Sequence, residues 1–164
     1  MRCMTQADVA AVLNIELSVQ AYPWTRGNFI DALNSDYVCC IDEAGREVRA
    51  YAILMPVVEE AELLNIGVAA AWQRKGLGRM VLNEMLLIAR ARSMKRVFLE
   101  VRSSNVAAIA LYRCAGFNLI GERRNYYQNA NGSEDALVMA CDLTQLSPLP
   151  LAGEGLEERV SGQT

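Results

Sequence analysis

A glycine-containing loop between an apolar strand and a long amphipathic segment constrains the fold of this chain more than any other feature. The pattern of residues 62–68 predicts a strand, that of 69–75 a loop, and that of 76–92 a helix with one apolar stripe. Gly76 and Gly78 stand where that helix begins, although glycine in a helix costs roughly 1 kcal/mol relative to alanine. Their position indicates that a backbone without side chains has a function at the start of this helix.

An anion-binding site is the role that this layout favours. The first turn of a helix has free N–H groups and the positive end of the helix dipole, and glycines let a phosphate approach without meeting a Cβ atom. Arg74, Lys75 and Arg79 would surround such an anion with positive charge. The alternative is an ordinary helix start whose cations are solvated.

Two common phosphate motifs are absent from this loop. The Walker sequence GxxxxGK[ST] does not occur, and the dinucleotide sequence GxGxxG fails because Val81 occupies the third glycine position. The pattern that does occur is Q-x-x-G-x-G, formed by Gln73, Gly76 and Gly78.

The order of helical and strand-like segments predicts an α+β (mixed α/β) domain of three layers over residues 1–143. Thr25 and Asn105 fit helix N-caps, and Gly116 fits the glycine that ends a helix. Val9, Val12, Leu13 and Leu17 predict the buried stripe of the first helix. Residues 144–164 are expected to form a disordered tail. The expected helices cover residues 5–20, 26–33, 76–92 and 106–114, and the expected strands 37–41, 48–58, 62–68, 97–101, 117–124 and 136–141, with a turn at 129–135.

Composition excludes several kinds of site and environment. The chain has no histidine, which excludes Ser-His and Cys-His catalysis. Its five cysteines contain no CxxC pair, so the sequence also argues against a zinc site. All five cysteines are expected to be small buried residues, kept reduced in a cytoplasmic protein. A net charge of −3 and the lack of an apolar run of ~20 residues argue against nucleic-acid and membrane partners.

The motif Q/R-x-x-G-x-G/A after a strand resembles the acetyl-CoA pyrophosphate signature of the GCN5-related N-acetyltransferase family, and the likeness extends over roughly residues 1–143. This resemblance implies that family's fold, in which helices cover both faces of a mostly antiparallel sheet that is splayed at the cofactor site. It also implies acetyl-CoA as cosubstrate and no metal. In one departure, three alanines follow Val68 where the family usually has an Asp-Pro turn.

The same resemblance implies roles for individual residues. Glu100 would be the general base, directly or through water, Tyr112 the general acid, and Asn105 a hydrogen-bonding partner of the cofactor arm. Backbone groups of residues 66–68 would hold the thioester and pantetheine, and those of 73–79 would wrap the pyrophosphate. The cofactor-binding residues implied in these two segments are Ile66, Gly67, Val68, Gln73, Arg74, Lys75, Gly76, Leu77, Gly78 and Arg79.

Elementary chemistry is consistent with both catalytic roles. Strand alternation in residues 97–101 places Glu100 opposite Val97, Leu99 and Val101, although a glutamate in such a place is more often solvated or ion-paired. Tyr112 on its own is more often a core residue. An α-amine has a pKa of roughly 7.7–8.0, so a carboxylate can complete its deprotonation, whereas a lysine amine has a pKa of roughly 10.4. A phenol with a pKa near 10 can protonate a leaving thiolate.

Four segments resemble more narrowly the branch of this family that acetylates the N-terminal alanine of a ribosomal protein. These are AYPWTRGNF, ELLNIGV, LEVRSSNVAAIALYRCAGF and RRNYYQNANGSEDALVM. The resemblance implies a small-subunit ribosomal protein, or its N-terminal peptide, as the substrate of a monomer. The groove that receives it would be lined by Trp24, Arg124, Tyr126 and Tyr127.

Three functions stay open from the sequence. The first is acetylation of a protein N-terminus, the second is acetylation of lysines or small amines by the same fold, and the third is CoA binding without catalysis. Glu100 and Tyr112 together argue against the third, because an inert binding protein needs neither. An assay on peptides that differ only at the first residue separates the first two.

Overall fold

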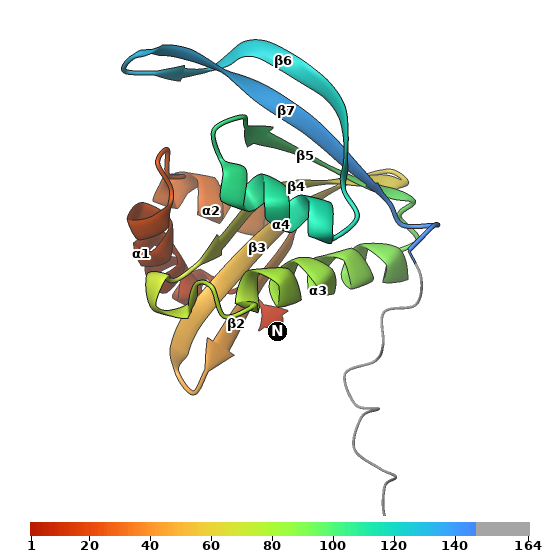
Figure 1. Ribbon diagram of the computed structural model, residues 1–164. Coiled ribbons are helices and arrows are strands. Elements are labelled where there is room, and N and C mark those ends of the chain that lie inside the picture. The colour runs from red at the N-terminus through yellow and green to blue at the C-terminus, as the bar shows by residue number, and fades with distance from the viewer. Residues whose placement is uncertain (147–164) are drawn as a thin grey trace, which may run out of the picture.

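The structure, a computed structural model, describes residues 1–146 as one seven-stranded sheet with helices on both faces (Figure 1). The strand order is β1-β2-β3-β4-β5-β7-β6, and only the β4–β5 pair is parallel among the described strands. The expected α+β class is therefore confirmed. The strands are β1 (Arg2–Cys3), β2 (Val38–Ala44), β3 (Glu47–Val57), β4 (Glu60–Val68), β5 (Arg96–Arg102), β6 (Asn118–Asn129) and β7 (Gly132–Asp142). The helices are η1 (Gln6–Asp8), α1 (Val9–Val19), α2 (Arg26–Asn34), η2 (Ala70–Trp72), α3 (Leu77–Ala91) and α4 (Val106–Cys114).

The side-chain alternation of β3 divides the apolar core into two layers. Ala52 and Leu54 pack in one cluster with residues of α3 and α4, while Tyr51 and Ile53 pack in the other with residues of α1 and α2. Successive strand residues point to opposite faces, so one apolar strand serves both layers. The helix pairs therefore lie on opposite faces of the sheet.

The buried stripe of α1 differs from the one expected. Val9 and Val12 are buried as predicted, but Leu17 is 59% exposed, and Glu16 is only 1% exposed in its place. A glutamate occupies this core position because its carboxylate accepts several hydrogen bonds there, as described below. Hydrophobicity alone does not predict a glutamate at this buried position.

The parallel strands β4 and β5 separate part-way along their length. They are paired only at Glu60–Arg96, Ala61–Val97 and Glu62–Phe98. Both strands continue beyond these pairs, β4 to Val68 and β5 to Arg102, with no further pairing to each other among the described residues. One edge of β4 is thereby left open, which is the expected splay.

Local capping signals fix the start of α2 and both ends of α4, as predicted. The Thr25 side chain accepts a hydrogen bond from Asn28 N at 3.2 Å, and that of Asn105 accepts one from Ala108 N at 3.2 Å. Gly116 has φ +97° and follows α4, a left-handed conformation that favours glycine. Gly76, with φ +82°, is the N-cap of α3.

The last hairpin is longer than expected. Strands β6 and β7 extend to Asn129 and from Gly132, so most of the segment predicted as a turn at 129–135 is strand. Asn129 pairs with Gly132, which leaves only a two-residue turn. The turn-forming residues tolerate strand geometry because the long antiparallel pairing extends through them. This hairpin projects from the rest of the sheet (Figure 1).

Three cysteines follow the expectation and two do not. Cys39, Cys40 and Cys141 are buried, but Cys3 and Cys114 are exposed, because they lie in the edge strand β1 and at the end of α4. All five are free thiols.

The described chain ends shortly after β7. Leu146 still packs against the core, and its carbonyl accepts a hydrogen bond from Arg90 Nη1 at 3.2 Å. Most of the tail expected at 144–164 lies outside the described residues. Among residues 1–146, the structure contains no helix of the length and apolarity that crossing a bilayer requires.

Candidate active site

The open edge of β4 presents the backbone of Ile66 and Val68. The Gln20 side chain donates a hydrogen bond to Ile66 O at 3.1 Å, and the Gln73 side chain donates one to Val68 O at 3.0 Å. The N–H and C=O groups of a strand residue point to the same side, so the N–H groups of Ile66 and Val68 also face the open edge. An extended ligand could accept hydrogen bonds from both.

Gly67 faces the opposite way, toward β3. Ala69 N donates to Arg49 O of β3 at 2.8 Å, and Gly67, two residues earlier, has the same orientation. A Cβ atom at Gly67 would collide with the hydroxyl and ring of Tyr51. The packing of Tyr51 under the strand therefore already requires a glycine at this position.

The start of α3 supplies free backbone donors. Met80 N donates to Gly76 O at 3.1 Å, and within residues 1–146 no side chain caps this helix. The N–H groups of residues 77–79 precede the first helical hydrogen bond and lack backbone acceptors. Arg74, with φ +60°, and Gly76, with φ +82°, turn the loop so that it leads into this helix end.

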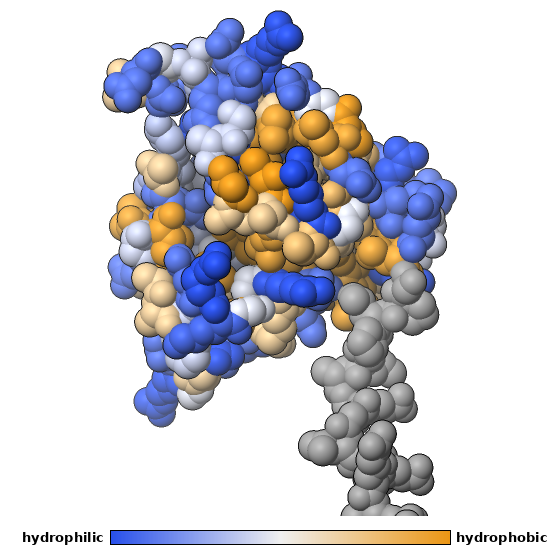
Figure 2. Space-filling view, in the orientation of Figure 1, coloured by the Kyte–Doolittle hydropathy of each residue, from blue (hydrophilic) through white to orange (hydrophobic). Residues whose placement is uncertain are grey.

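A cleft, called here the loop cleft, joins this helix end to the β4 edge. Lys75 and Leu77 are absent from its lining: Lys75 Nζ lies 5.1 Å from the centre of the Trp72 ring, and Leu77 is buried in the core. Figure 2 shows hydrophilic residues gathered around the loop before α3, below an apolar area over α4. The other predicted cofactor-binding residues line the loop cleft, namely Ile66, Gly67, Val68, Gln73, Arg74, Gly76, Gly78, Arg79 and Asn105.

The loop cleft has the chemistry that acetyl-CoA requires. Free N–H groups at a helix N-terminus, with Arg74 and Arg79 beside them, suit a diphosphate. The outward N–H groups of Ile66 and Val68 suit the amides of a pantetheine arm. These residues are thus a consistent donor set for both ends of that ligand.

Replacing Gly78 by valine is expected to weaken CoA binding at least tenfold. A Cβ atom at Gly78 would lie 3.6 Å from Leu111 Cδ2 and 3.6 Å from Val68 Cγ2, which is ordinary contact, so the variant should fold. The added methyl groups would enter the loop cleft, where a close approach of phosphate to the backbone is expected. Calorimetric titration with CoA measures the loss, and Gly121→Val in β6, with nothing within 4 Å of its Cβ, is the control. Unchanged affinity in a folded Gly78→Val protein would refute the phosphate-loop assignment.

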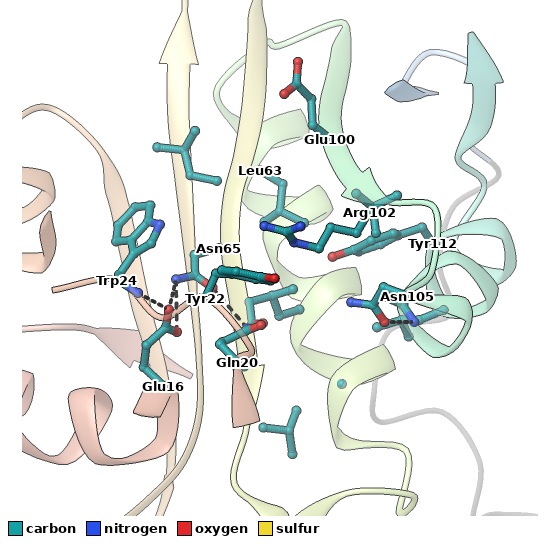
Figure 3. Close-up of a pocket in the computed structure, with 18 of the residues that line it drawn as sticks. Glu16, Gln20, Tyr22, Trp24, Leu63, Asn65, Glu100, Arg102, Asn105 and Tyr112 are labelled. Atoms are coloured by element: carbon teal, nitrogen blue, oxygen red, sulfur yellow. Dashed lines mark hydrogen bonds between the residues drawn. The ribbon is translucent and has the colours of Figure 1, made fainter. Parts of the chain in front are cut away.

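A second cleft, called here the central cleft, lies between β4 and β5 and contains both predicted catalytic side chains. It is lined by residues 63–68 of β4, residues 100–102 of β5, part of α4 and the connection between α1 and α2. Figure 3 shows the Glu100 carboxylate at one end of this cleft, with Tyr112 and Arg102 near its middle. It shares Ile66–Val68, Gly78 and Asn105 with the loop cleft, so the two clefts are continuous.

Glu100 is accessible in the central cleft. As predicted, Val97, Leu99 and Val101 are buried on the other face of β5. Glu100 Oε1 lies 3.0 Å from Nε of Arg123, whose side chain is 56% exposed. Ion pairs with such exposed partners contribute little, so the carboxylate can exchange this partner for another.

Tyr112 is a largely buried residue in the lining of the central cleft. Its ring centre lies 5.8 Å from that of Phe117. Burial, together with nearby Tyr127, raises the pKa of Tyr112 to about 12. The phenol therefore stays protonated throughout the neutral pH range, which is the form that a proton donor needs.

The structure places two of the four predicted substrate residues in the lining of the central cleft and two outside it. Trp24 and Tyr127 line the central cleft. Tyr126 lies outside the lining, with 47% of its surface exposed and its ring centre 5.1 Å from that of Tyr127. Arg124 is exposed on β6 and is also outside the lining.

A buried hydrogen-bond network beneath the central cleft escaped the sequence analysis. Glu16 accepts hydrogen bonds from Trp24 N at 2.7 Å, from the Asn65 side chain at 3.1 Å and from the Tyr51 hydroxyl. Gln20 extends the network, because its amide lies 3.4 Å from Asn65 Oδ1. The network joins the α1–α2 connection to β4. Figure 3 shows Glu16, Gln20, Trp24 and Asn65 on the side of the cleft opposite Tyr112.

Comparison with known proteins decides the family. Residues 9–117 match the acetyltransferase (GNAT) family, which is more than half of the chain. This chain belongs to the GNAT family. It is therefore an acetyl-CoA-dependent N-acetyltransferase, and the loop cleft is the place where the family motif lies in this GNAT protein.

Individual relatives share nearly the whole length of this GNAT domain. The [ribosomal protein bS18]-alanine N-acetyltransferase of Salmonella typhimurium is 40% identical over 141 residues, which cover 86% of this chain and 95% of the relative. The crystal structure of the ribosomal-protein-S18-alanine N-acetyltransferase from Escherichia coli superposes with a TM-score of 0.82 at 36% identity, covering 96% of this chain and 97% of that one. A ribosomal-protein-alanine N-acetyltransferase from Brucella melitensis gives 0.75 at 26% identity, covering 86% and 98%.

Proposed function

We propose that this enzyme transfers acetyl from acetyl-CoA to the N-terminal alanine of the ribosomal protein bS18. The observation that carries the proposal is the 40% identity to the Salmonella typhimurium enzyme over 86% of this chain. The match spans 141 residues, so it extends far beyond the glycine loop of the loop cleft.

In this proposal residues of the loop cleft bind the cofactor, and Glu100 and Tyr112 in the central cleft transfer protons. Acetyl-CoA supplies an activated acetyl thioester. Backbone N–H groups of Ile66 and Val68 hold the cofactor arm, and the N-terminus of α3 holds the diphosphate. The side-chain amide of Asn105, whose oxygen caps α4, has its N–H groups left to donate to the arm.

Glu100 and Tyr112 carry the proton transfers. Glu100 takes a proton from the substrate α-ammonium, directly or through a water molecule, which frees the amine lone pair for attack on the acetyl carbon. Tyr112 gives its proton to the departing sulfur. The raised pKa of Tyr112 makes the phenol a weaker acid than the thiol that forms, so the leaving thiolate keeps the proton.

A peptide panel tests the preference for a small first residue. Peptides that share one sequence after position 1 and begin with alanine, leucine or tryptophan are compared by kcat/KM at saturating acetyl-CoA. We expect the alanine peptide to exceed the bulky ones at least tenfold, because a closed pocket rejects a larger side chain by clash. Equal values across the panel would refute an alanine-specific enzyme.

A further inference from the structure

Arg102 contacts two tyrosine rings that come from separate segments on either side of the central cleft. The Arg102 guanidinium carbon lies 3.7 Å from the centre of the Tyr22 ring and 4.0 Å from that of Tyr127. Tyr22 comes from the α1–α2 connection, Arg102 is the last residue of β5, and Tyr127 belongs to β6. All three line the cleft together with Glu100 and Tyr112.

The guanidinium is itself fixed in place. Arg102 Nη1 lies 3.4 Å from Glu134 Oε2, and both side chains are largely buried, with 18% and 16% exposed. Glu134 Oε1 accepts a hydrogen bond from Ser104 N at 2.7 Å. This carboxylate therefore anchors Arg102 to the backbone that follows β5.

Hydrogen bonds hold the backbone on both sides of Tyr22, whereas its side chain is in contact with Arg102. Gln20 bonds Ile66 O and Trp24 N bonds Glu16, so the connection is anchored two residues before and two residues after Tyr22. Tyr22 is 49% exposed, and its ring has Arg102 as its cationic partner (Figure 3). The orientation of this ring is therefore set by Arg102.

The Tyr127 ring, on the β6–β7 hairpin, is placed at the cleft by the backbone of β6. The β6–β7 register shifts between Arg123 and Tyr127, where Asn125 has φ +53° and its N–H donates to Asp135 Oδ1 at 2.7 Å. This irregularity precedes the residue that reaches Arg102. Pairing with β7 resumes at Tyr127 itself, which places its ring at the cleft.

We propose that Arg102 is a positioning residue that holds Tyr22 and Tyr127 as two walls around the substrate's first side chain, and thereby sets the selection for a small first residue. The inference rests on the proposed function and adds to it the group that keeps the pocket narrow. A guanidinium is planar and can stack flat on an aromatic ring, whereas a lysine ammonium is compact and cannot. Arg102→Lys therefore keeps the charge opposite Glu134 but loses the stacking that orients the two rings.

The test is the ratio of kcat/KM for the alanine peptide to that for the leucine peptide. In Arg102→Lys we expect this ratio to fall about tenfold, because a compact ammonium cannot stack flat between the two rings as a planar guanidinium does. The change should appear as a higher KM for the alanine peptide and a gain for the leucine peptide. A uniform loss of kcat on both peptides would indicate a merely structural role and would overturn the proposal.

Arg49 offers a matched control. Its guanidinium lies 4.7 Å from the centre of the Trp72 ring and 2.6 Å from Asp42 Oδ2, outside the central cleft. Arg49→Lys changes the same kind of contact and should leave the ratio unchanged. Tyr22→Phe keeps a ring over Arg102 and should retain the wild-type ratio, whereas Tyr22→Leu should lower it.

The outcomes separate this inference from the proposed function. A wild-type ratio in folded Arg102→Lys and Tyr22→Leu proteins would overturn the role of Arg102 and leave the N-terminal acetyltransferase assignment intact. A wild-type enzyme without any preference for alanine would refute the assignment, and the inference with it.

Discussion

Replacing Glu100 by glutamine is expected to lower kcat/KM for peptide acetylation by about 10²–10⁴-fold, the usual contribution of a general base. Glutamine has nearly the same shape, so β5 and its pairing with β7 should persist. It cannot accept a proton from an ammonium group, so the step that frees the α-amine loses its base. The loss should appear in a steady-state assay together with a changed pH–rate profile.

Binding measurements and a control variant separate this effect from damage to the fold. Affinity for CoA should be retained in Glu100→Gln, because the loop cleft does not contain Glu100. Glu122→Gln, which changes an exposed glutamate on β6, should have wild-type activity.

Tyr112→Phe should lower kcat with little change in peptide affinity, because the ring contact with Phe117 remains. Wild-type turnover by both Glu100→Gln and Tyr112→Phe would show that the two residues are structural.

Features encoded by neighbouring residues were predictable from the sequence. The caps at Thr25 and Asn105 and the glycine at 116 depend on contacts within a few residues, and all three were found as expected. The orientation of Glu100 follows from strand alternation alone. The glycine loop was identified because a helix start with two glycines is locally unfavourable and so needs a reason.

Features built from distant segments were not predictable in this way. The Arg102 stack joins residues from three separate parts of the chain, and no local pattern marks Tyr22 as their partner. Glu16 has the sequence signature of a surface residue, and only Tyr51 and Asn65, brought together by β3 and β4, make its burial favourable. The one available signal was the phase of α1, in which Glu16 follows Val9 and Val12 at spacings of seven and four.

The chemical nature of the acceptor amine is the central claim, and a blocked peptide tests it with the largest expected effect. An α-amine loses its proton near neutral pH, whereas a lysine amine, with a pKa of roughly 10.4, would require a site that lowers its pKa by two or more units. Among the described residues that line the central cleft, the charged side chains are Glu16, Glu100 and Arg102. Two carboxylates against one guanidinium would favour the charged form of a lysine rather than its neutral, nucleophilic form.

The measurement uses two peptides that begin Ala-Arg and contain one internal lysine, one with a free α-amine and one with that amine blocked. Each is incubated with acetyl-CoA and the wild-type enzyme, and mass spectrometry locates the acetyl group. The account predicts acetylation of the free peptide at its N-terminal alanine and no acetylation of the blocked peptide. Acetylation of the lysine in the blocked peptide at a comparable rate would contradict it and identify a lysine acetyltransferase of the same fold.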